Sequence, residues 1–391
     1  MNDQPVAGDG GQANHPTGSV ATLGAYDRFN YGDLLFPLVL DDAAARLRLR
    51  PLSHFSVRAA DMSNFAGFTC HSLASKEFAG ATGVLVGGGE VLGARWGQAL
   101  ISQTPAPFDK ALLALNKISA RGLDLYSMWR LGGSDLSPFI PTVGPDRRLA
   151  TNAIGASSIA MLPPRYRAHV IEVLASAAYL SVRDSAGLEL LRGEGLRPTL
   201  APDSASVLAR LYPVPRVDNG TLVVQCSWSW LRRNLSPFLQ FVREASSQYT
   251  QIALLPIGLA GGHGDSEALR RVQSAVRREN VQVVQVRHIW DIAEAIAQSA
   301  AFVGSSLHGH VTAMAYGVPS VALAGISKLT AYVETWGDDA IPVVAPLDLS
   351  AAVVRARSAN FAFLLERADR LADLADVSTR RALASLAEQQ S

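Results

Sequence analysis

The sequence has 391 residues, of which 48% are hydrophobic and 18% are charged, and its formal net charge is +1. A chain of this length exceeds a single typical core, so we expect two domains of a well-buried α/β protein. The near-zero net charge excludes a nucleic-acid-binding protein that depends on a broadly basic face. Cys70 and Cys226 fit no metal or redox spacing, and no apolar run is long enough to span a membrane. These features favour a cytoplasmic protein without a metal site.

The first half of the sequence alternates between strand and helix patterns. Residues 1–18 have almost nothing to bury and are expected to form a disordered arm. An N-terminal α/β domain is predicted over residues 19–213. Its strands are expected at 20–26, 54–60, 81–86, 149–154 and 178–182, and its helices at 34–46, 111–121, 165–177 and 185–192.

The alternation becomes more regular after Pro213 and Pro215, which open the best domain boundary. A C-terminal α/β domain is predicted over residues 219–345, and a helical tail over 346–391 is expected to pack back on both domains. The second domain's strands are expected at 221–226, 252–256, 281–286, 301–303 and 319–323, and its helices at 236–248, 265–278, 290–300, 307–316 and 327–336. The pattern predicts two Rossmann-like, doubly wound sheets, in which ligands bind beyond the carboxyl ends of the strands.

The stretch 301–323 is the strongest candidate for a binding site. It predicts a buried strand, a tight turn and a short helix that begins at Leu307. Ser305 or Ser306 is expected to cap this helix and to leave its first backbone N–H groups free. An anion docked there would meet amides, hydroxyls and the imidazole of His308.

Other polar turns are expected on the same rim, and they carry Arg287, Lys328 and His263. Such a rim suits a small dense anion, such as a phosphate or a carboxylate, better than a neutral ligand. Each residue also has a structural explanation, because a histidine beside a strand end is more often structural and Lys328 is by default a solvated lysine. His310 points to a different side of the helix from His308 and is interpreted as structural.

A polar turn after the first predicted strand contains Asp27, Asn30, Tyr31 and Asp33. Its functional interpretation is a site for sugar hydroxyls, with Asp33 or Asp27 as the proton acceptor. The alternative is an ordinary polar loop, since Asn, Gly and Asp are common in turns.

The triplet Gly87-Gly88-Gly89 and then Glu90 follow another predicted strand. The glycine spacing misses the dinucleotide fingerprint, and no Gly-Lys-Ser/Thr sequence follows. The triplet is either a ligand-binding loop or a turn that lies close to another backbone, and Glu90 is either a base or a rim carboxylate. Arg183 lies at a further strand end, where Asp184 before Ser185 is interpreted as a helix N-cap.

Several motifs occur in an order that is typical of one family. They are residues 24–33 (GAYDRFNYGD), 87–89 (GGG), 181–185 (SVRDS), 201–203 (APD), 304–309 (GSSLHG), 315–319 (AYGVP), Lys328 and 336–337 (WG). Any one of these motifs is loose, but the ordered set is fairly specific and covers most of residues 20–340. With this set the chain resembles the polysaccharide pyruvyl transferases.

The resemblance implies a two-domain fold similar to that of the GT-B glycosyltransferases, with the active site in the cleft between the domains. The family transfers a pyruvyl group from phosphoenolpyruvate to two hydroxyls of one sugar and forms a cyclic ketal. Phosphoenolpyruvate is then a co-substrate, and the scheme requires no cofactor or metal. The resemblance places donor binding or proton transfer at His308 with its neighbours Ser306 and Leu307, and an anion contact at Lys328.

From the rim and the resemblance together, we assign catalytic roles to His308 and Asp33. The donor-binding set is Ser305, Ser306, Leu307, His308, Lys328, Arg287 and Arg183. The acceptor-binding set is Asp27, Asn30, Tyr31, Asp33, Gly88 and Glu90.

Family members often carry an arginine where this chain has Ser306, so Arg287, Arg183 or Arg95 is expected to replace it. Two alternatives stay open: a sugar- or anion-binding homologue that has lost catalysis, and a GT-B glycosyltransferase that uses a nucleotide sugar. The expected partners are phosphoenolpyruvate and a saccharide acceptor, with no nucleic acid. Two questions stay open as well: whether the acceptor is lipid-linked, which would place the protein at the inner face of the membrane, and whether the chain forms a homo-oligomer.

Overall fold

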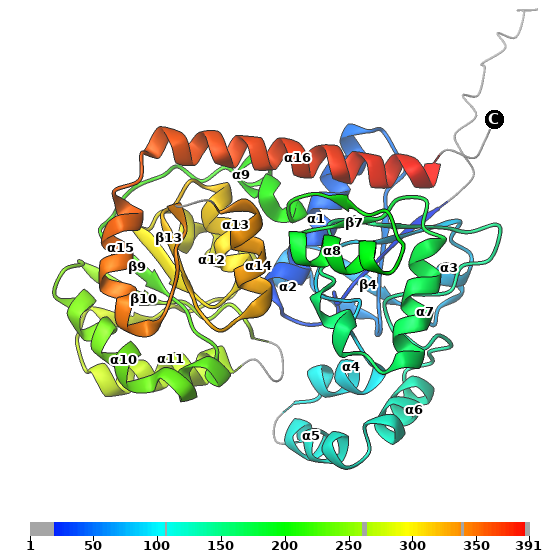
Figure 1. The fold of residues 1–391 in the computed structure, drawn as a ribbon, viewed down its shortest axis with the longest axis horizontal. Coiled ribbons are helices and arrows are strands. Elements are labelled where there is room, and N and C mark those ends of the chain that lie inside the picture. Colours follow the sequence, from blue (N-terminus) through cyan, green and yellow to red (C-terminus); the bar gives the residue numbers. More distant parts are fainter. Residues whose placement is uncertain (1–18, 106–107, 260–263, 338–339, 388–391) are drawn as a thin grey trace, which may run out of the picture.

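The computed structural model describes residues 19–105, 108–259, 264–337 and 340–387, so the predicted arm at 1–18 lies outside the described residues. Two α/β domains lie side by side, and the long helix α16 (Phe361–Ala387) runs along both of them (Figure 1). The prediction of an α/β fold with two parallel-sheet domains and a C-terminal helix is confirmed.

The first sheet has the strand order β3-β4-β2-β1-β5-β6, and all neighbours are parallel except β3 with β4. Its strands are β1 (Val20–Leu23), β2 (Ser53–Ser56), β3 (Ala60–Asp61), β4 (Thr69–Ser72), β5 (Gly83–Val86) and β6 (Arg148–Thr151). The chain reverses its direction of progress across the sheet between β1 and β5, where Leu23 pairs with Val86. Both strands therefore end at the same level and leave a crevice beyond their carboxyl ends.

The second sheet has the strand order β11-β10-β9-β12-β13-β14, and every neighbouring pair is parallel. Its strands are β9 (Thr221–Val224), β10 (Gln251–Leu254), β11 (Val281–Val283), β12 (Ala301–Gly304), β13 (Ser320–Leu323) and β14 (Val343–Val344). This is the doubly wound order of a Rossmann fold, with its switch point between β9 and β12. The central strands are buried throughout, as their continuous apolar sequences predict.

The helices of the first domain follow the predicted order, with additions. They are α1 (Tyr31–Arg46), α2 (Ser63–Ala66), α3 (Lys76–Ala79), α4 (Trp96–Gln103), α5 (Phe108–Ile118), α6 (Ala120–Arg130), α7 (Pro164–Ala175), α8 (Ser185–Gly193) and α9 (Leu208–Leu211), with the 3-10 turns η1 (Ser157–Met161) and η2 (Ser204–Val207). The strands β7 (Ser181–Val182) and β8 (Thr199–Leu200) form a small separate sheet. The single helix predicted at 111–121 is wrong, because the chain breaks at Ser119, whose side chain accepts a hydrogen bond from the Gly122 N–H and caps α6.

The helices of the second domain and the tail lie close to their predicted positions. They are α10 (Trp228–Ser246), α11 (Asp265–Val276), α12 (Ile289–Ala297), α13 (Leu307–Ala315), α14 (Ser327–Trp336) and α15 (Leu349–Arg357), followed by α16. Helix α10 begins earlier than predicted because Ser227 caps it, and it continues through Pro237 with a non-helical residue at Asn234. The predicted helical tail consists of α15 and α16 in the described residues.

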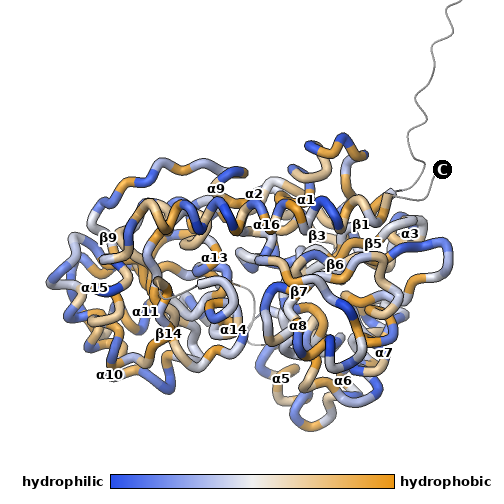
Figure 2. Tube along the Cα trace, turned by 45° about the horizontal axis from the view of Figure 1, so that its top comes forward, coloured by the Kyte–Doolittle hydropathy of each residue, from blue (hydrophilic) through white to orange (hydrophobic). Residues whose placement is uncertain are grey.

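Apolar packing joins the two domains on one side. A single cluster of buried residues includes Tyr31 and Phe36 of α1 together with Ile289 of α12 and Val311 of α13. Helix α16 adds hydrogen bonds to both domains, from Arg367 Nη1 to the Gly337 carbonyl and from the Asn152 side chain to Thr379. Figure 2 shows hydrophobic and hydrophilic residues alternating along α16, as expected of a helix with one face on the protein.

Candidate active site

A cleft of about 470 Å³ lies where the switch points of the two sheets face each other. Its first wall comes from the turns after β1 and β5 and from α4, and is lined by Ala25, Arg28, Asn30, Asp33, Glu90, Val91, Gln98, Ala99 and Ser102. Its second wall comes from the turns after β9, β10, β12 and β13, and is lined by Gln225, Ser227, Ile257, Gly258, Ser305, Ser306, Leu307, His308 and Lys328. Carboxyl ends of both sheets thus converge on one space, which is where ligands bind in doubly wound folds.

His308 projects from the second domain onto α1 of the first. Ser306 caps α13 by accepting a hydrogen bond from the Gly309 N–H, which places His308 in the first turn of that helix. The imidazole lies against the backbone of Gly32, where a Cβ atom would overlap the ring. It also contacts the Phe36 ring edge to face, with centroids 5.6 Å apart. The absence of a side chain at Gly32 is therefore what makes room for His308.

Asp203 faces the other side of the imidazole. Its Oδ2 lies 3.4 Å from Nε2 of His308 and 3.6 Å from Nη1 of Arg183. Asp203 is fully buried and is held at the start of η2, where its side chain accepts a hydrogen bond from the Ala205 N–H. A carboxylate in this position can orient an imidazole and stabilise its protonated form.

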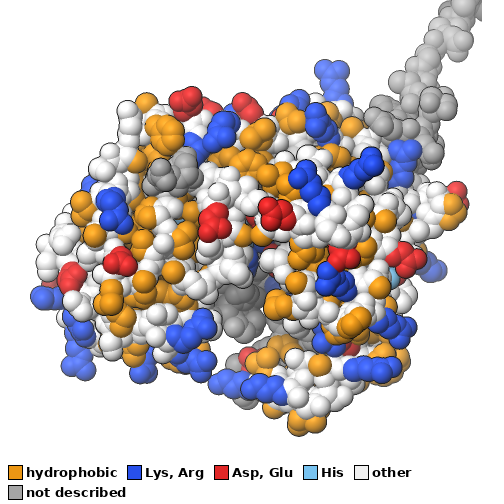
Figure 3. Space-filling view, viewed as in Figure 1, with side chains coloured by type: hydrophobic (Ala, Val, Ile, Leu, Met, Phe, Trp, Pro, Cys, Tyr) orange, Lys and Arg blue, Asp and Glu red, His pale blue; other side chains and the backbone are white. Residues whose placement is uncertain are grey.

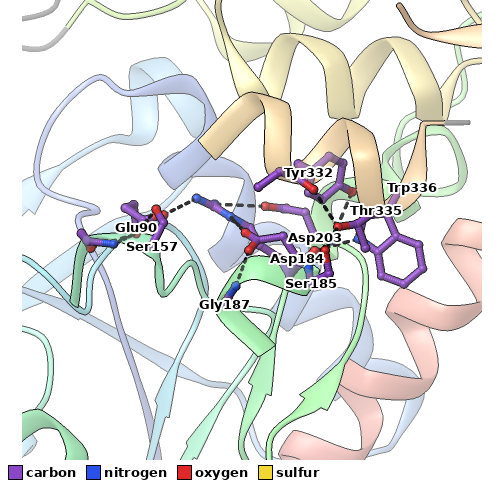
Figure 4. A network of polar contacts seen from close by, with 12 residues as sticks. Glu90, Ser157, Asp184, Ser185, Gly187, Asp203, Tyr332, Thr335 and Trp336 are labelled. Atoms are coloured by element: carbon purple, nitrogen blue, oxygen red, sulfur yellow. Dashed lines mark hydrogen bonds and ion pairs between the residues drawn. The ribbon is translucent and has the colours of Figure 1, made fainter. Parts of the chain in front are cut away.

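Arg183 connects Asp203 to the far side of the cleft. Its Nη2 donates a hydrogen bond to Glu90 Oε2 at 2.8 Å, and its Nε lies 4.0 Å from Asp184. Figure 4 shows Glu90, Asp184 and Asp203 gathered into one polar network that continues to Trp336, whose indole N–H donates to the Arg183 carbonyl. A guanidinium buried to this degree is stable only because carboxylates surround it.

The network fixes the charges of its members. Burial raises the pKa of Glu90, but Arg183 and the hydrogen bonds from Ser158 outweigh it and hold the pKa below its usual range. Burial likewise raises the pKa of Asp203, and His308 and Arg183 bring it below its usual range. Asp184 differs, because its burial dominates and its pKa is raised. Glu90 and Asp203 are therefore ionised at neutral pH.

Lys328 supplies a second cation to the cleft from the start of α14. Burial and the nearby charge of Arg183 lower the pKa of its ammonium, while Glu90 and Asp33 oppose this. None of the described residues accepts a hydrogen bond from Lys328 or forms an ion pair with it. A half-buried ammonium without a partner is a ready contact for an anion.

The start of α13 differs from the prediction of free backbone amides. Gln225, at the end of β9, accepts hydrogen bonds through Oε1 from the N–H groups of both Ser305 and Ser306 at 2.9 Å. Among the first N–H groups of α13, only those of Leu307 and His308 lack an acceptor in the described residues. The expectation that a serine caps this helix is confirmed, but the amides available to an anion lie one step further into the helix.

Asp33 and Asn30 face these groups from the first wall. Asn30 donates a hydrogen bond through Nδ2 to Asp33 Oδ2 at 2.6 Å, and its backbone pairs with Gly258 across the cleft. One oxygen of Asp33 is thereby occupied. The other lies beside Gly89, where a Cβ would come within 3.0 Å of it.

Several residues assigned to the site from the sequence lie away from the cleft surface. Asp27 accepts hydrogen bonds from the Arg28 guanidinium, the Arg58 N–H and the Gln103 side chain, so it tethers loops rather than facing a ligand. Tyr31 is buried and its hydroxyl pairs with Thr312 at 2.9 Å.

Gly88 and Arg287 also lie apart from the cleft lining. Gly88 has a φ of 142° and packs against Phe36, which supports the structural interpretation of the glycine triplet. Arg287 is exposed, and its backbone N–H donates to Asp291. Arg95 forms an ion pair with Asp124, so of the three arginines expected to replace one at Ser306, only Arg183 lines the cleft.

The structure gives some cleft residues a role that differs from the predicted one, and it adds others. Glu90 lines the cleft, but its two oxygens accept bonds from Ser157, Ser158 and Arg183, so it positions Arg183 and cannot serve as a free base. Gln225 and Arg28 also line the cleft, and neither belongs to the sets predicted from the sequence, because Gln225 lies in no motif and Arg28 is one polar residue of a turn.

Two further histidines do not contribute to the cleft lining that the structure describes. His263 lies outside the described residues. His310 is buried and bonded to the Gly304 carbonyl, and burial lowers its pKa to about 4, as its structural interpretation requires.

The described residues hold neither a metal-binding cluster nor a membrane-spanning helix. No group of three or more His, Cys, Asp and Glu side chains within them could hold a metal ion. No helix that the structure describes is both long enough and apolar enough to cross a membrane.

A family model described as polysaccharide pyruvyl transferase matches residues 71–326, well over half of the chain. The chain belongs to this family. The match includes Glu90, Arg183, Asp203 and His308 of the polar network that crosses the cleft. No functionally curated protein matches the sequence.

Solved structures with the same fold share little sequence with this chain. A putative UDP-N-acetylglucosamine 2-epimerase from Listeria monocytogenes is 11% identical, with a TM-score of 0.55 over 90% of this chain and 94% of that chain. MnaA from S. aureus, in a co-structure with UDP, is 12% identical, with a TM-score of 0.54 over 95% of this chain and 94% of that chain. At such identities the likeness shows the fold alone, and it confirms the GT-B-like architecture.

Proposed function

We propose that the protein transfers the pyruvyl group of phosphoenolpyruvate to two hydroxyls of one sugar in a poly- or oligosaccharide precursor, forming a cyclic ketal and releasing phosphate. The observation that carries the proposal is the pairing of His308 with Asp203 at the edge of a cleft whose opposite wall holds Asp33. Membership of the pyruvyl transferase family supports the reaction class. Phosphoenolpyruvate is the only co-substrate in this scheme, which takes place in the cytoplasm.

The donor carries a phosphate and a carboxylate and so requires several cations or amides. Lys328 offers an ammonium without a partner, and the unoccupied N–H groups of Leu307 and His308 lie at the positive end of α13. Arg183 adds positive charge behind them, although its own donors are directed to carboxylates. In this scheme Lys328 and the start of α13 replace the arginine that is often found at Ser306 in the family.

The reaction then needs one acid and one base. His308, held by Asp203, protonates the methylene carbon of phosphoenolpyruvate while a sugar hydroxyl forms a bond to C2. Asp33 accepts the proton of that hydroxyl. The C2–O bond to phosphate breaks, the second hydroxyl bonds to C2, and its proton leaves with the phosphate. Asp33 then gives up its proton and His308 regains one through solvent, so both groups return to their starting state. Of the two hydroxyl protons, one thus ends on the new methyl group and one on phosphate, and the atoms and charges balance.

The first test is the thermal shift of the purified protein with phosphoenolpyruvate, phosphate, pyruvate, UDP and GDP. A ligand that binds only the native state raises its stability by RT ln(1 + [L]/Kd). We expect phosphoenolpyruvate to give the largest rise and His308→Ala to reduce it. A larger response to UDP or GDP would contradict the proposal and favour a nucleotide-sugar glycosyltransferase.

One observation favours a second candidate, a homologue that binds its ligands without turnover. Ser306 stands where the family often has arginine, and its side chain is committed to capping α13. The two candidates differ in phosphate release from phosphoenolpyruvate in the presence of saccharide precursors. Acceptor-dependent release that Asp33→Asn abolishes would dismiss the inactive homologue, and binding without release across such acceptors would support it.

A further inference from the structure

Helix α5 has a pronounced apolar side, yet that side faces solvent. Phe108, Leu115 and Ile118 follow one another at helical spacing and are 68%, 45% and 83% exposed. The only buried residue of α5 is Asp109. An amphipathic helix normally packs its apolar side on the core, so this orientation is inverted.

Helix α6 presents a second apolar surface next to the first. Leu125, Tyr126 and Trp129 lie on its outward side, Trp129 is 76% exposed, and the Tyr126 and Trp129 rings are 6.2 Å apart. The opposite side is anchored, because Asp124 accepts a hydrogen bond from the Gly97 N–H of α4 and pairs with Arg95. The exposed aromatic residues are therefore held outward by a fixed packing arrangement.

The charges of this helix pair are segregated. Over residues 108–130, all of which the structure describes, the exposed charged side chains are Lys110, Lys117, Arg121 and Arg130. The two carboxylates, Asp109 and Asp124, are buried. The surface is therefore purely cationic around its apolar centre, although the whole chain carries a formal net charge of only +1. Figure 3 shows blue (Lys, Arg) and orange (hydrophobic) side chains at the lower edge of the molecule, where Figure 1 places α5 and α6.

We propose that the outward side of α5 and α6 binds the surface of an anionic phospholipid membrane. Exposed tryptophan, tyrosine and aliphatic side chains flanked by lysine and arginine match the interfacial layer, where apolar groups enter the acyl boundary and cations meet phosphate head groups. A nucleic acid would engage the cations but not Ile118 and Phe108. The four cations without an exposed carboxylate also oppose a second copy of the same surface.

The position of this membrane surface suits the candidate active site. Helix α4 lines the cleft through Gln98, Ala99 and Ser102 and carries α6 on its other side through Asp124. A protein resting on α5 and α6 would therefore hold the mouth of its cleft close to the lipid head groups. The membrane binding itself does not depend on the proposed reaction.

The test is flotation of the full chain with vesicles of phosphatidylcholine alone or with about one third phosphatidylglycerol. We expect binding only to the anionic vesicles, and we expect it to weaken at least tenfold between about 0.1 M and about 1 M NaCl. Ile118→Ser with Trp129→Ser should reduce binding at least tenfold, and so should replacing the four cations with glutamine. The matched control is Leu347→Ser, which removes an 82% exposed leucine elsewhere on the surface.

Because the substituted side chains are exposed, unfolding temperature and phosphoenolpyruvate-induced thermal shift should not change in these variants. Absence of binding to anionic vesicles, or equal binding to both vesicle types, would overturn the inference. A dimer in solution that Ile118→Ser with Trp129→Ser dissociates would overturn it too, by assigning the surface to self-association. Failure of vesicle binding leaves the thermal-shift test of the proposed function unaffected, so the two ideas can fail separately.

Discussion

Asp203 is the residue through which the first domain acts on His308, the candidate acid of the second domain. It lies 3.4 Å from His308 and 3.6 Å from Arg183, and water does not reach it. Because it does not line the cleft, we assign it a positioning role: it orients the imidazole and supplies a negative charge beside it.

Replacing Asp203 with asparagine should therefore impair turnover more than donor binding. We expect Asp203→Asn to lower kcat about 100-fold or more while KM for phosphoenolpyruvate changes little, because the imidazole loses its counter-charge. Steady-state phosphate release measures both constants. A rise in KM with an unchanged kcat would instead give Asp203 a role in donor binding.

Lys328 should contribute to donor binding and not to the stability of the fold. Its pKa is lowered on folding, so the charged form opposes folding below the lowered pKa, and this opposition is relieved as pH rises from there to the ordinary value. We expect Lys328→Met to unfold at the same temperature as the parent or higher. Its affinity for phosphoenolpyruvate should fall about 10- to 100-fold, as for loss of one charge-assisted hydrogen bond.

Calorimetric titration and thermal unfolding measure these two effects. The control is Lys76→Met, an exposed lysine on α3 that lies outside the cleft lining. Unchanged donor affinity in Lys328→Met would remove this lysine from the donor site.

At the scale of elements, the contact between α13 and α1 sets the geometry of the site. His308 fits only because Gly32 has no side chain. We expect Gly32→Ala to displace the imidazole and to lower kcat/KM about 100-fold, since small misplacements of reacting groups carry penalties of this size.

The control for this change is Gly193→Ala, at the end of α8, where an added Cβ meets no atom within 4 Å. It should leave activity intact. Equal activity of the Gly32→Ala and parent proteins would show that the close contact with α1 is not needed for turnover.

The helices and N-caps of the site could be predicted from the sequence, whereas the hydrogen bonds between residues far apart in the chain could not. The N-cap at Ser306, the helix after it and the N-cap at Asp184 all follow from patterns within a few residues. By contrast, Gln225 reaches residues 80 positions away and Glu90 reaches Arg183 93 positions away. Such contacts depend on how the sheets are placed, so no local pattern carries them.

The same reasoning applies to the predicted site residues that do not line the cleft. Asp27 and Tyr31 belong to the motif at 24–33 and Gly88 to the motif at 87–89, and the side chains or backbone of all three face protein rather than the cleft. Motif membership indicates proximity to a site, and only packing decides which member faces it.

At the scale of the whole molecule, the buried network makes stability depend on acidity. The pKa values of Glu90 and Asp203 lie below their usual 4.5 and 3.8 in the folded protein, so the unfolded chain binds these protons more tightly. Their stabilisation is present above those values and is lost as pH falls through the lowered pKa values. The raised pKa of Asp184 acts in the opposite direction and partly offsets this loss.

We therefore expect the free energy of unfolding to fall steeply between about pH 5 and about pH 3. Urea unfolding at a series of pH values measures it. Glu90→Gln should be less stable at neutral pH, because it leaves Arg183 with one carboxylate fewer, and should show a flatter acid dependence. An identical dependence in both proteins would mean that other carboxylates govern the acid response.

Helix α16 also bears on the order in which the molecule can be completed during synthesis. Leu383 packs in one cluster with Leu85 of β5, and Arg148 donates to the Ser385 carbonyl 237 residues further along the chain. The first domain thus lacks part of its core until α16, which follows the second domain in the chain, has emerged from the ribosome. Its folding has to wait for that segment, in contrast to the usual progression in which an N-terminal domain folds while the rest is still being made.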